Sequence, residues 1–187
     1  MKPTDVLMNE HRLIEHVLDA LEIAADRLHR GQAVRPAFFL EAADFIAGFA
    51  DGCHHHKEEG VLFGAMRESG APAGGGPIEV MLAEHEQGRT LTRGLREAAR
   101  RLESGDASAR VQVVSHARRY VALLREHIAK EDNVLFPLAD ALLSSERTVS
   151  VLQGFERIER EETGEGAHER FHALAEKLAR EAKALGA

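Results

Sequence analysis

Apolar residues recur every three or four positions along most of this chain, which is the period of an amphipathic α-helix. Two weaker helical patterns, at 146–163 and 167–184, come at the end of the chain. The strong pattern predicts four long helices, over residues 4–30, about 36–69, 78–104 and about 106–143. The sequence therefore predicts an all-α fold in which a four-helix bundle is followed by an additional C-terminal helical segment.

The fourth predicted helix has the most regular apolar stripe, and two polar residues lie within it. One buried face is predicted to contain Val113, Ala117, Tyr120, Leu124, His127, Glu131, Val134 and Leu138. An unpaired carboxylate on such a face would cost several kcal/mol or would remain protonated. A cation is therefore expected beside Glu131.

Two stretches of the chain are near copies of each other. The segment HHHKEEGVLF aligns with the later segment HIAKEDNVLFP, so that Glu58 falls over Glu131. The same alignment places His54 over His127. Both segments then contain His-x-x-x-Glu, and residues four apart lie on one face of a helix. An imidazole and a carboxylate that point into the same space are a typical pair of metal ligands.

A second repeat supports the first, because the dipeptide Glu10-His11 recurs as Glu84-His85 at almost the same distance along the chain. Each half of the chain then carries one helix with a single His and one helix with His-x-x-x-Glu. The predicted organisation is a metal-binding bundle over residues 1–144, made of copies 1–70 and 77–144, with a C-terminal helical extension, 145–187, packed on it.

Four helices arranged in this way would bring six ligands to the middle of the bundle. Helix bundles hold two metal ions with such sets, in which carboxylates bridge the metals and imidazoles complete the coordination. The predicted ligands are His11, His54, Glu58, His85, His127 and Glu131.

Two neighbouring residues stay open as alternative ligands. His55 could add a seventh ligand at a shifted angle, although the residue at its repeat position is Ile128. Asp132 competes with Glu131 in the fourth helix, and the repeat favours Glu131.

Two further features of the sequence are left without a predicted role in the centre. His168 and His172 have a spacing that can bind zinc on a helix, but no third ligand stands near them in the sequence. Cys53 is the only cysteine, and we expect a buried thiol there rather than a ligand.

The third predicted helix repeats the first in register but carries smaller residues near the expected centre. Gly88 and Thr92 stand where the first helix has Ile14 and Leu18. These smaller side chains could leave room for a small ligand beside the metals, or Gly88 could serve close helix packing. Tyr120 could donate a hydrogen bond near the centre or simply pack in the core.

Composition and charge exclude some classes of function but do not identify one. The net charge of −7 argues against general binding to nucleic acid or to an anionic membrane, because both require a basic surface. The chain shows no signal peptide and no apolar run long enough to span a membrane, so we expect a cytoplasmic protein. Eleven His residues in a chain with one Tyr and no Trp also indicate metal binding.

These motifs together resemble the hemerythrin-like, or HHE cation-binding, family, over roughly residues 5–143. The resemblance implies an up-down-up-down four-helix bundle around an oxo- or hydroxo-bridged pair of iron ions. It makes the four His terminal ligands and the two Glu bridging ligands. The oxygen-carrying members have a further His where this chain has Arg89, and they use an Asp at the position of Asp132.

Because Arg89 replaces that further His, the resemblance does not imply that this chain carries oxygen reversibly. Our leading expectation is a non-haem di-iron protein that binds or reduces oxygen, peroxide or nitric oxide, and whether it is an enzyme stays open. The alternative is an iron storage, delivery or sensing module without turnover. Zn or Mn could replace iron at such ligands. A homodimer is compatible with the sequence.

Overall fold

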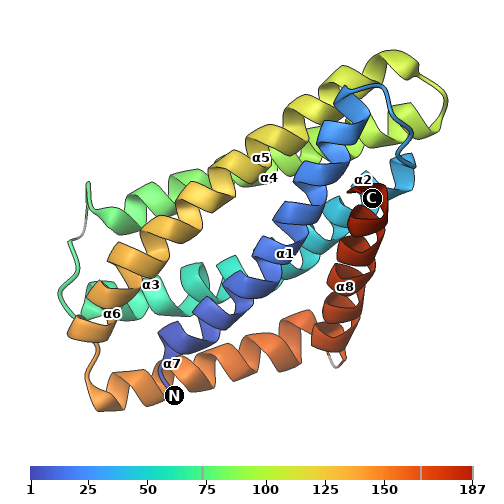
Figure 1. The fold of residues 1–187 in the computed structure, drawn as a ribbon. Helices are drawn as coiled ribbons and strands as arrows, with labels where there is room; N and C mark the ends of the chain where they lie inside the picture. Colours follow the sequence, from blue (N-terminus) through green and yellow to red (C-terminus); the bar gives the residue numbers. More distant parts are fainter. Residues whose placement is uncertain (73, 165, 187) are drawn as a thin grey trace.

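The computed structural model describes residues 1–72, 74–164 and 166–186, and over these residues the regular structure is helical throughout (Figure 1). The first half contains α1 (Pro3–His29), α2 (Pro36–Phe45), the π-helical η1 (Ile46–His55) and η2 (Glu58–Leu62), and α3 (Phe63–Glu68). The second half contains α4 (Pro77–Glu103), the 3₁₀ turn η3 (Ala107–Ala109), α5 (Arg110–Lys130), the π-helical η4 (Glu131–Leu135) and α6 (Phe136–Leu142). The C-terminal part contains α7 (Ser145–Ile158), the π-helical η5 (Glu159–Thr163) and α8 (Ala167–Gly186). The four predicted long helices are confirmed, with α2 to α3 and α5 to α6 each forming one nearly continuous rod.

Local sequence explains where the long helices begin and end. Pro3, Pro36 and Pro77 each occupy the first position of a helix, where the missing N–H removes no helical hydrogen bond. Gly70 follows the second long helix with a φ of 103°, a left-handed conformation that glycine adopts without steric cost.

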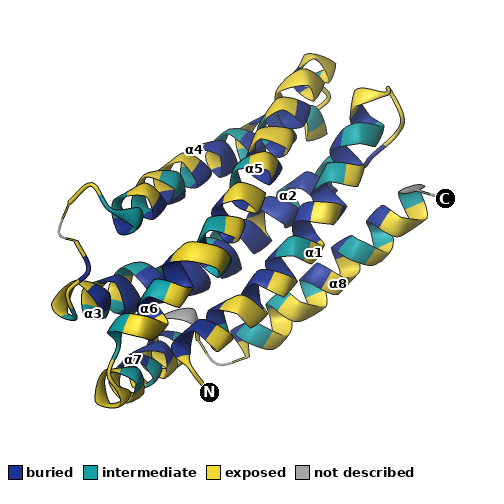
Figure 2. Cartoon of the chain, turned by 60° about the vertical axis from the view of Figure 1, so that its left-hand side comes forward, coloured by how far each residue is buried: buried dark blue, intermediate teal, exposed yellow. Residues whose placement is uncertain are grey.

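The long helices lie alongside one another, and the C-terminal part packs against them. α1 contacts α5, α5 contacts α4, and α4 contacts α2, so the four elements enclose a common interior. α8 lies against α1 and α2, and α7 contacts η2 and α1 (Figure 1). Buried residues form stripes on the facing sides of the helices and exposed residues cover their outer sides (Figure 2). Among the residues that the structure describes, no helix is both long and apolar enough to cross a membrane.

A layer of buried polar residues divides the core into two apolar clusters. Along α1, Leu7 belongs to one cluster, Ile14 belongs to the other, and the buried His11 lies between them. Along α4, His85 likewise separates Met81 of the first cluster from the second cluster. The polar layer is therefore shielded from water at both ends by packed apolar side chains.

The structure corrects one part of the predicted stripe on the fourth helix. Val134 was expected in the core but is 57% exposed, whereas Leu135 is 1% exposed and belongs to the core. The cause is the π-helical turn η4, which adds a residue to the turn and rotates every later side chain about the helix axis. An equivalent turn, η2, begins at Glu58 in the first half, so each of the two glutamates predicted as ligands begins a π-helical turn.

Candidate metal centre

Four histidines meet in the polar layer, each contributed by a different long helix. His11 comes from α1, His54 from η1, His85 from α4 and His127 from α5, and all four are buried. Because the helices run side by side at these positions, the four rings face the common interior. The ring centroids of His11 and His54 lie 4.6 Å apart, and those of His85 and His127 lie 4.8 Å apart. The histidines thus form two pairs.

Glu58 links the two histidine pairs from one side. Its Oε1 atom lies 3.6 Å from Nε2 of His54, and its Oε2 atom lies 3.5 Å from Nε2 of His85. The side chain is completely buried. One carboxylate therefore places one oxygen at each histidine pair, which is the geometry of a bridging ligand.

Glu131 repeats this arrangement from the opposite half of the chain. Its Oε2 atom lies 3.2 Å from Nε2 of His11, and its Oε1 atom lies 3.1 Å from Nε2 of His127. It is also completely buried. All six predicted ligands are thus brought together by the fold.

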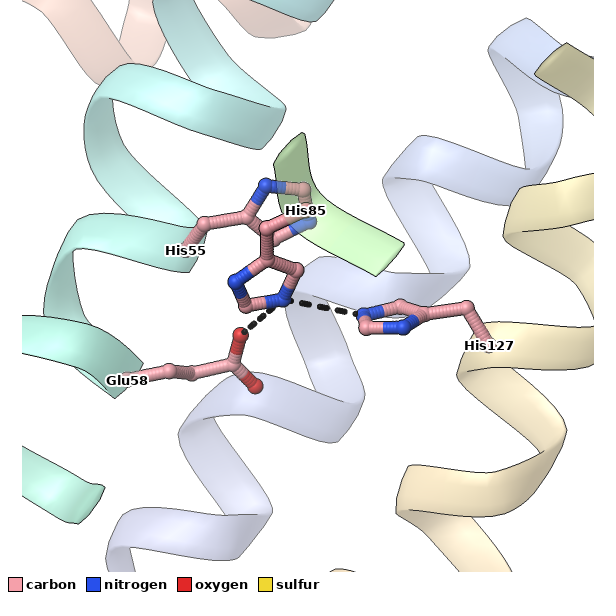
Figure 3. A group of neighbouring side chains, drawn as sticks. All are labelled: His55, Glu58, His85 and His127. Carbon is pink, nitrogen blue, oxygen red and sulfur yellow. Dashed lines mark hydrogen bonds and ion pairs between the residues drawn. The ribbon is translucent and has the colours of Figure 1, made fainter. Parts of the chain in front are cut away.

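The ligand atoms fall into two overlapping groups, and within each group they lie within 4.8 Å of one another. One group contains His11, His54, Glu58 and Glu131. The other, drawn in Figure 3, contains His55, Glu58, His85 and His127. Glu58 belongs to both groups, so the arrangement suits two adjacent cations that share carboxylate ligands.

His55, which the sequence left open, lies at the second group. Its ring stacks on that of His85 with centroids 3.9 Å apart and planes inclined by 16°. The side chain is buried, and Nδ1 lies 3.6 Å from Oδ1 of Asp51. His55 can therefore complete the second group. The first group has no equivalent residue, because the repeat position of His55 is occupied by Ile128, which has no ligand atom.

Each of the four paired histidines donates its outer N–H to a carboxylate. His54 Nδ1 donates to Oε2 of Glu10 over 2.9 Å, and His127 Nδ1 donates to Oε2 of Glu84 over the same distance. Such acceptors fix the ring orientation and raise the basicity of the nitrogen that faces the metal. Sequence reasoning missed the roles of both glutamates, although they precede His11 and His85 in the same repeated dipeptide.

The two remaining acceptors, Glu59 and Asp132, directly follow Glu58 and Glu131 in the sequence. His85 Nδ1 donates to Oε1 of Glu59, and His11 Nδ1 donates to Oδ1 of Asp132, both over 2.7 Å. Asp132, considered as a rival ligand, is thus placed on the outer nitrogen of His11, outside both ligand groups. The correspondence of Glu59 with Asp132 in the repeat alignment was the available signal for this role.

These hydrogen bonds of Nδ1 determine whether the inner nitrogen, Nε2, is free to bind a metal ion. A carboxylate only accepts, so Nδ1 carries the proton, and Nε2 of a neutral ring presents a lone pair. His85 Nε2 and His127 Nε2 then face each other at 3.1 Å (Figure 3). Against the opposing effect of burial, the carboxylates of Glu131 and Glu84 raise the pKa of His127, which favours a proton between the two nitrogens when no metal is bound, and a metal cation would take the place of that proton.

The centre also contains most of the unpaired buried polar atoms in the described part of the chain. Such atoms are costly in a protein interior unless an ion or a ligand satisfies them. The atoms without a hydrogen-bond partner at the centre are Nε2 of His11 and His54, both ring nitrogens of His55, and both carboxylate oxygens of Glu58 and Glu131. They are the atoms that the two groups would offer to metal ions, so the residues present fit a pair of cations.

Electrostatics favour a bound cation for the same reason. Burial and the nearby carboxylate of Glu131 raise the pKa of Glu58 well above its usual value, because two buried negative charges repel each other. Burial lowers the pKa of His54 to about 4, so that this ring is neutral at pH 7. Neutral imidazoles and carboxylates bridged by metal ions resolve both costs.

A further cluster of polar residues supports the first group from outside. Glu10 uses its second oxygen, Oε1, to pair with the buried Lys57, which also contacts Glu159. His168 Nε2 lies 3.5 Å from the same oxygen of Glu10, and Cys53 is buried beside this cluster. The Lys57 ammonium supplies the positive charge here, so the cluster serves as a support for His54 through Glu10.

Comparison with known proteins agrees with this site. The chain is 26% identical over 180 residues to "Uncharacterized protein Rv1995" of Mycobacterium tuberculosis and to "Uncharacterized protein Mb2018" of Mycobacterium bovis. The alignments cover 96% of this chain and 69% of each relative. The family model described as "Hemerythrin HHE cation binding domain" matches residues 2–139. This chain, with its two groups of buried His and Glu side chains, therefore belongs to the hemerythrin HHE cation-binding family.

Proposed function

We propose that the protein is a non-haem di-iron protein whose metal pair binds or reduces a small ligand, with peroxide, oxygen and nitric oxide as the candidates. The observation that carries the proposal is the geometry of Glu58 and Glu131. Each buried carboxylate places one oxygen at each histidine pair, and these four oxygens have no hydrogen-bond partner among the described residues. The up-down-up-down order of the hemerythrin bundle is part of this proposal, supported by the contacts of α1, α5, α4 and α2.

In this proposal the ligands divide into two sets that share the bridging glutamates. One metal is held by His11 and His54, and the other by His85 and His127, with His55 beside the second. Imidazole and carboxylate ligands suit iron, and Zn or Mn can occupy the same donors. A bound iron pair supplies two electrons for the reduction of peroxide.

The residues around the ligands hold them for this chemistry. The outer carboxylates of Glu10, Glu59, Glu84 and Asp132 orient the four imidazoles. Glu58 and Glu131 keep the two metal positions at a fixed separation. The apolar clusters above and below the polar layer restrict the access of water.

The test is metal analysis combined with optical spectroscopy on protein purified without added metal. We expect close to two irons per chain and a near-ultraviolet band that changes when peroxide is added. Glu131→Ala should lose this band, whereas Glu126→Ala, at an exposed position of α5, should retain it. Retained iron without a reaction toward peroxide, oxygen or nitric oxide would favour storage or delivery. A chain that takes up no ferrous iron would refute the di-iron assignment.

A further inference from the structure

The two halves of the bundle differ most beside the second ligand group. Gly88 and Thr92 of α4 take the repeat positions of Ile14 and Leu18 of α1. Ile14 and Leu18 are buried in the larger apolar cluster. The side of the bundle next to α1 is therefore filled at these positions, while the side next to α4 has smaller groups.

The second long helix departs from the repeat on the same side. His55 and Asp51 correspond to Ile128 and Leu124 of α5 in the alignment that pairs Glu58 with Glu131. Ile128 and Leu124 are buried members of the same apolar cluster. At four positions, then, the side of the bundle formed by α1 and α5 is closed by large aliphatic residues, and the side formed by α4 and the second long helix carries polar or small ones.

These four departures line one cavity. The cavity has a volume of about 150 Å³ and lies between η1, α4 and α5. Its wall includes all four of these residues, together with Ile46, Ala47, Arg89, Arg93, Arg96 and Tyr120. The space that the smaller residues of α4 could leave is therefore present, and a ligand of a few heavy atoms fits it.

Two buried polar side chains on the cavity wall form no side-chain hydrogen bond to the described residues. Tyr120 is 1% exposed, and its hydroxyl group forms no hydrogen bond to any described residue. Both ring nitrogens of His55 are also without a hydrogen bond. A buried hydroxyl without a partner is unfavourable, so a ligand that accepts its hydrogen bond would bind favourably here.

The charged residues of the cavity indicate what kind of ligand it takes. The Arg89 guanidinium contacts Asp51 at 2.7 Å, Glu59 at 2.6 Å and Glu86 at 2.5 Å. Its positive charge is already balanced by these carboxylates, and Arg96 is paired with Asp44 at 2.7 Å. Arg93, the third arginine on the wall, donates a hydrogen bond to the Thr90 hydroxyl over 3.0 Å and has further N–H donors. An apolar diatomic molecule would leave the Tyr120 hydroxyl unsatisfied. The wall therefore favours a small polar molecule that accepts hydrogen bonds, as hydrogen peroxide does.

We propose that this cavity is the binding site for hydrogen peroxide, with the Tyr120 hydroxyl as its hydrogen-bond donor and with His55, a member of the second ligand group, as the wall toward the other ligands of that group. The proposal rests on the proposed function, because it identifies which ligand approaches the metal pair and from which side. Tyr120 and His55 bind and orient the ligand. Oxygen and nitric oxide are the competing occupants to be tested.

Tyr120 makes the proposal measurable without any redox turnover. It is the only tyrosine of a chain without tryptophan, so the intrinsic tyrosine fluorescence reports the cavity alone. We would titrate hydrogen peroxide into zinc-loaded protein, in which the metal is redox-inert. The expected result is a saturable change in tyrosine emission that catalase reverses, which separates binding from oxidation.

The decisive variant is Thr92→Leu, which places a leucine on α4 at the position that corresponds to Leu18 of α1. The added side chain should fill the cavity and abolish the saturable change, while metal content and helicity stay as in the wild type. Leu18→Met, a volume-conserving change on the filled side, is the matched control and should keep the full response. If Thr92→Leu fails to fold, Gly88→Ala adds a methyl group at ordinary contact distance, 3.6 Å from the Tyr120 ring, and should weaken binding.

The outcomes separate this proposal from the di-iron assignment. No saturable response in folded, zinc-loaded protein would overturn the peroxide site, and so would an undiminished response in Thr92→Leu. A saturable response to oxygen or nitric oxide in place of peroxide would also overturn it. A protein that takes up no metal would refute the di-iron centre alone, because the titration can be repeated on metal-free protein and would still show whether peroxide occupies the cavity.

Discussion

Lys57 and Glu10 form an ion pair that is buried between α1 and the second long helix. The pair is coupled to the metal centre, because the other oxygen of Glu10 accepts the hydrogen bond of His54. The repeat-related pair, Lys130 and Glu84, supports His127 in the same way but is more open to solvent, with 39% of the lysine side chain exposed. The two repeat-related ion pairs are therefore expected to contribute different amounts to the free energy of unfolding.

Replacing Lys57 by Met should be much more damaging than replacing Lys130 by Met. The first change leaves the Glu10 carboxylate buried without its main cation, which costs roughly 3–5 kcal/mol of unfolding free energy. The second removes a partly exposed pair, worth at most about 1 kcal/mol. Chemical denaturation of both variants measures the difference. Equal losses would show that burial of the first pair is unimportant.

Glu58→Gln should change stability in opposite directions with and without metal. In metal-free protein, burial and the neighbouring Glu131 carboxylate raise the pKa of Glu58, so its charge is unfavourable and a neutral Gln should leave the unfolding free energy the same or raise it. In metal-loaded protein it removes a bridging ligand, so the stabilisation by the metal should shrink. Thermal unfolding with and without added ferrous iron under exclusion of oxygen checks both signs. The exposed substitution Glu126→Gln should show neither effect.

Asp132→Asn should weaken the metal centre without removing a metal. Because Asp132 contacts the outer nitrogen of His11, its loss should lower metal affinity by roughly 10–100-fold while the stoichiometry stays at two at saturating metal. Metal titration with elemental analysis of the saturated protein separates the two quantities. A stoichiometry of one would indicate that Asp132 is itself a ligand, contrary to its position here.

Two glycine substitutions should test how tightly α7 packs on the bundle. A methyl group at Gly154 would lie 2.7 Å from Cγ1 and 3.1 Å from Cγ2 of Val61, and the branched side chain leaves little room for rotation. Gly154→Ala should therefore cost about 1–3 kcal/mol. Gly64→Ala, also within a helix, meets no atom of the described chain within 4 Å and should stabilise by about 0.5–1 kcal/mol. Denaturant unfolding gives both values, and a stabilising Gly154→Ala would contradict the packing.

The attachment of α8 should weaken at acidic pH. Hydrogen bonds from Arg35 lower the pKa of Glu41 from its usual 4.5, against the opposing effect of burial, and Lys177 of α8 contributes in the same direction. A lowered folded-state pKa means that the stabilisation is present above pH 4.5 and is lost as the pH falls through the folded value. Glu41→Gln should flatten this part of the pH dependence of unfolding, whereas Glu169→Gln, at an exposed position of α8, should leave it unchanged.

The sequence was sufficient to predict the long helices and to propose the six ligands because both depend on spacing. Helix period places His54 and Glu58 one turn apart, and the internal repeat relates them to His127 and Glu131. Hydrophobic periodicity also identified the helices of the C-terminal part. Helix period and internal repeats can be recognised without knowing which distant segments contact each other in the fold.

What the sequence could not provide depends on contacts between elements. The π-helical turns add a residue that no spacing rule anticipates, so Val134 was wrongly expected in the core. The roles of Glu10 and Lys57 depend on α1 lying against the second long helix. The cavity depends on how Tyr120 and Gly88 face each other across α5 and α4, and side-chain size in the sequence could only suggest it.

The π-helical turns have a consequence for the history of the chain. η2 and η4 begin at Glu58 and Glu131, which are equivalent positions of the internal repeat. A duplication of one segment that already contained the extra residue accounts for its presence at both positions. A single ancestral hairpin that paired with its own copy would have presented the same four histidines and two glutamates about a twofold axis. Duplication and fusion then allowed the side formed by α4 and the second long helix to exchange large aliphatic residues for the cavity, while the side formed by α1 and α5 kept the core closed.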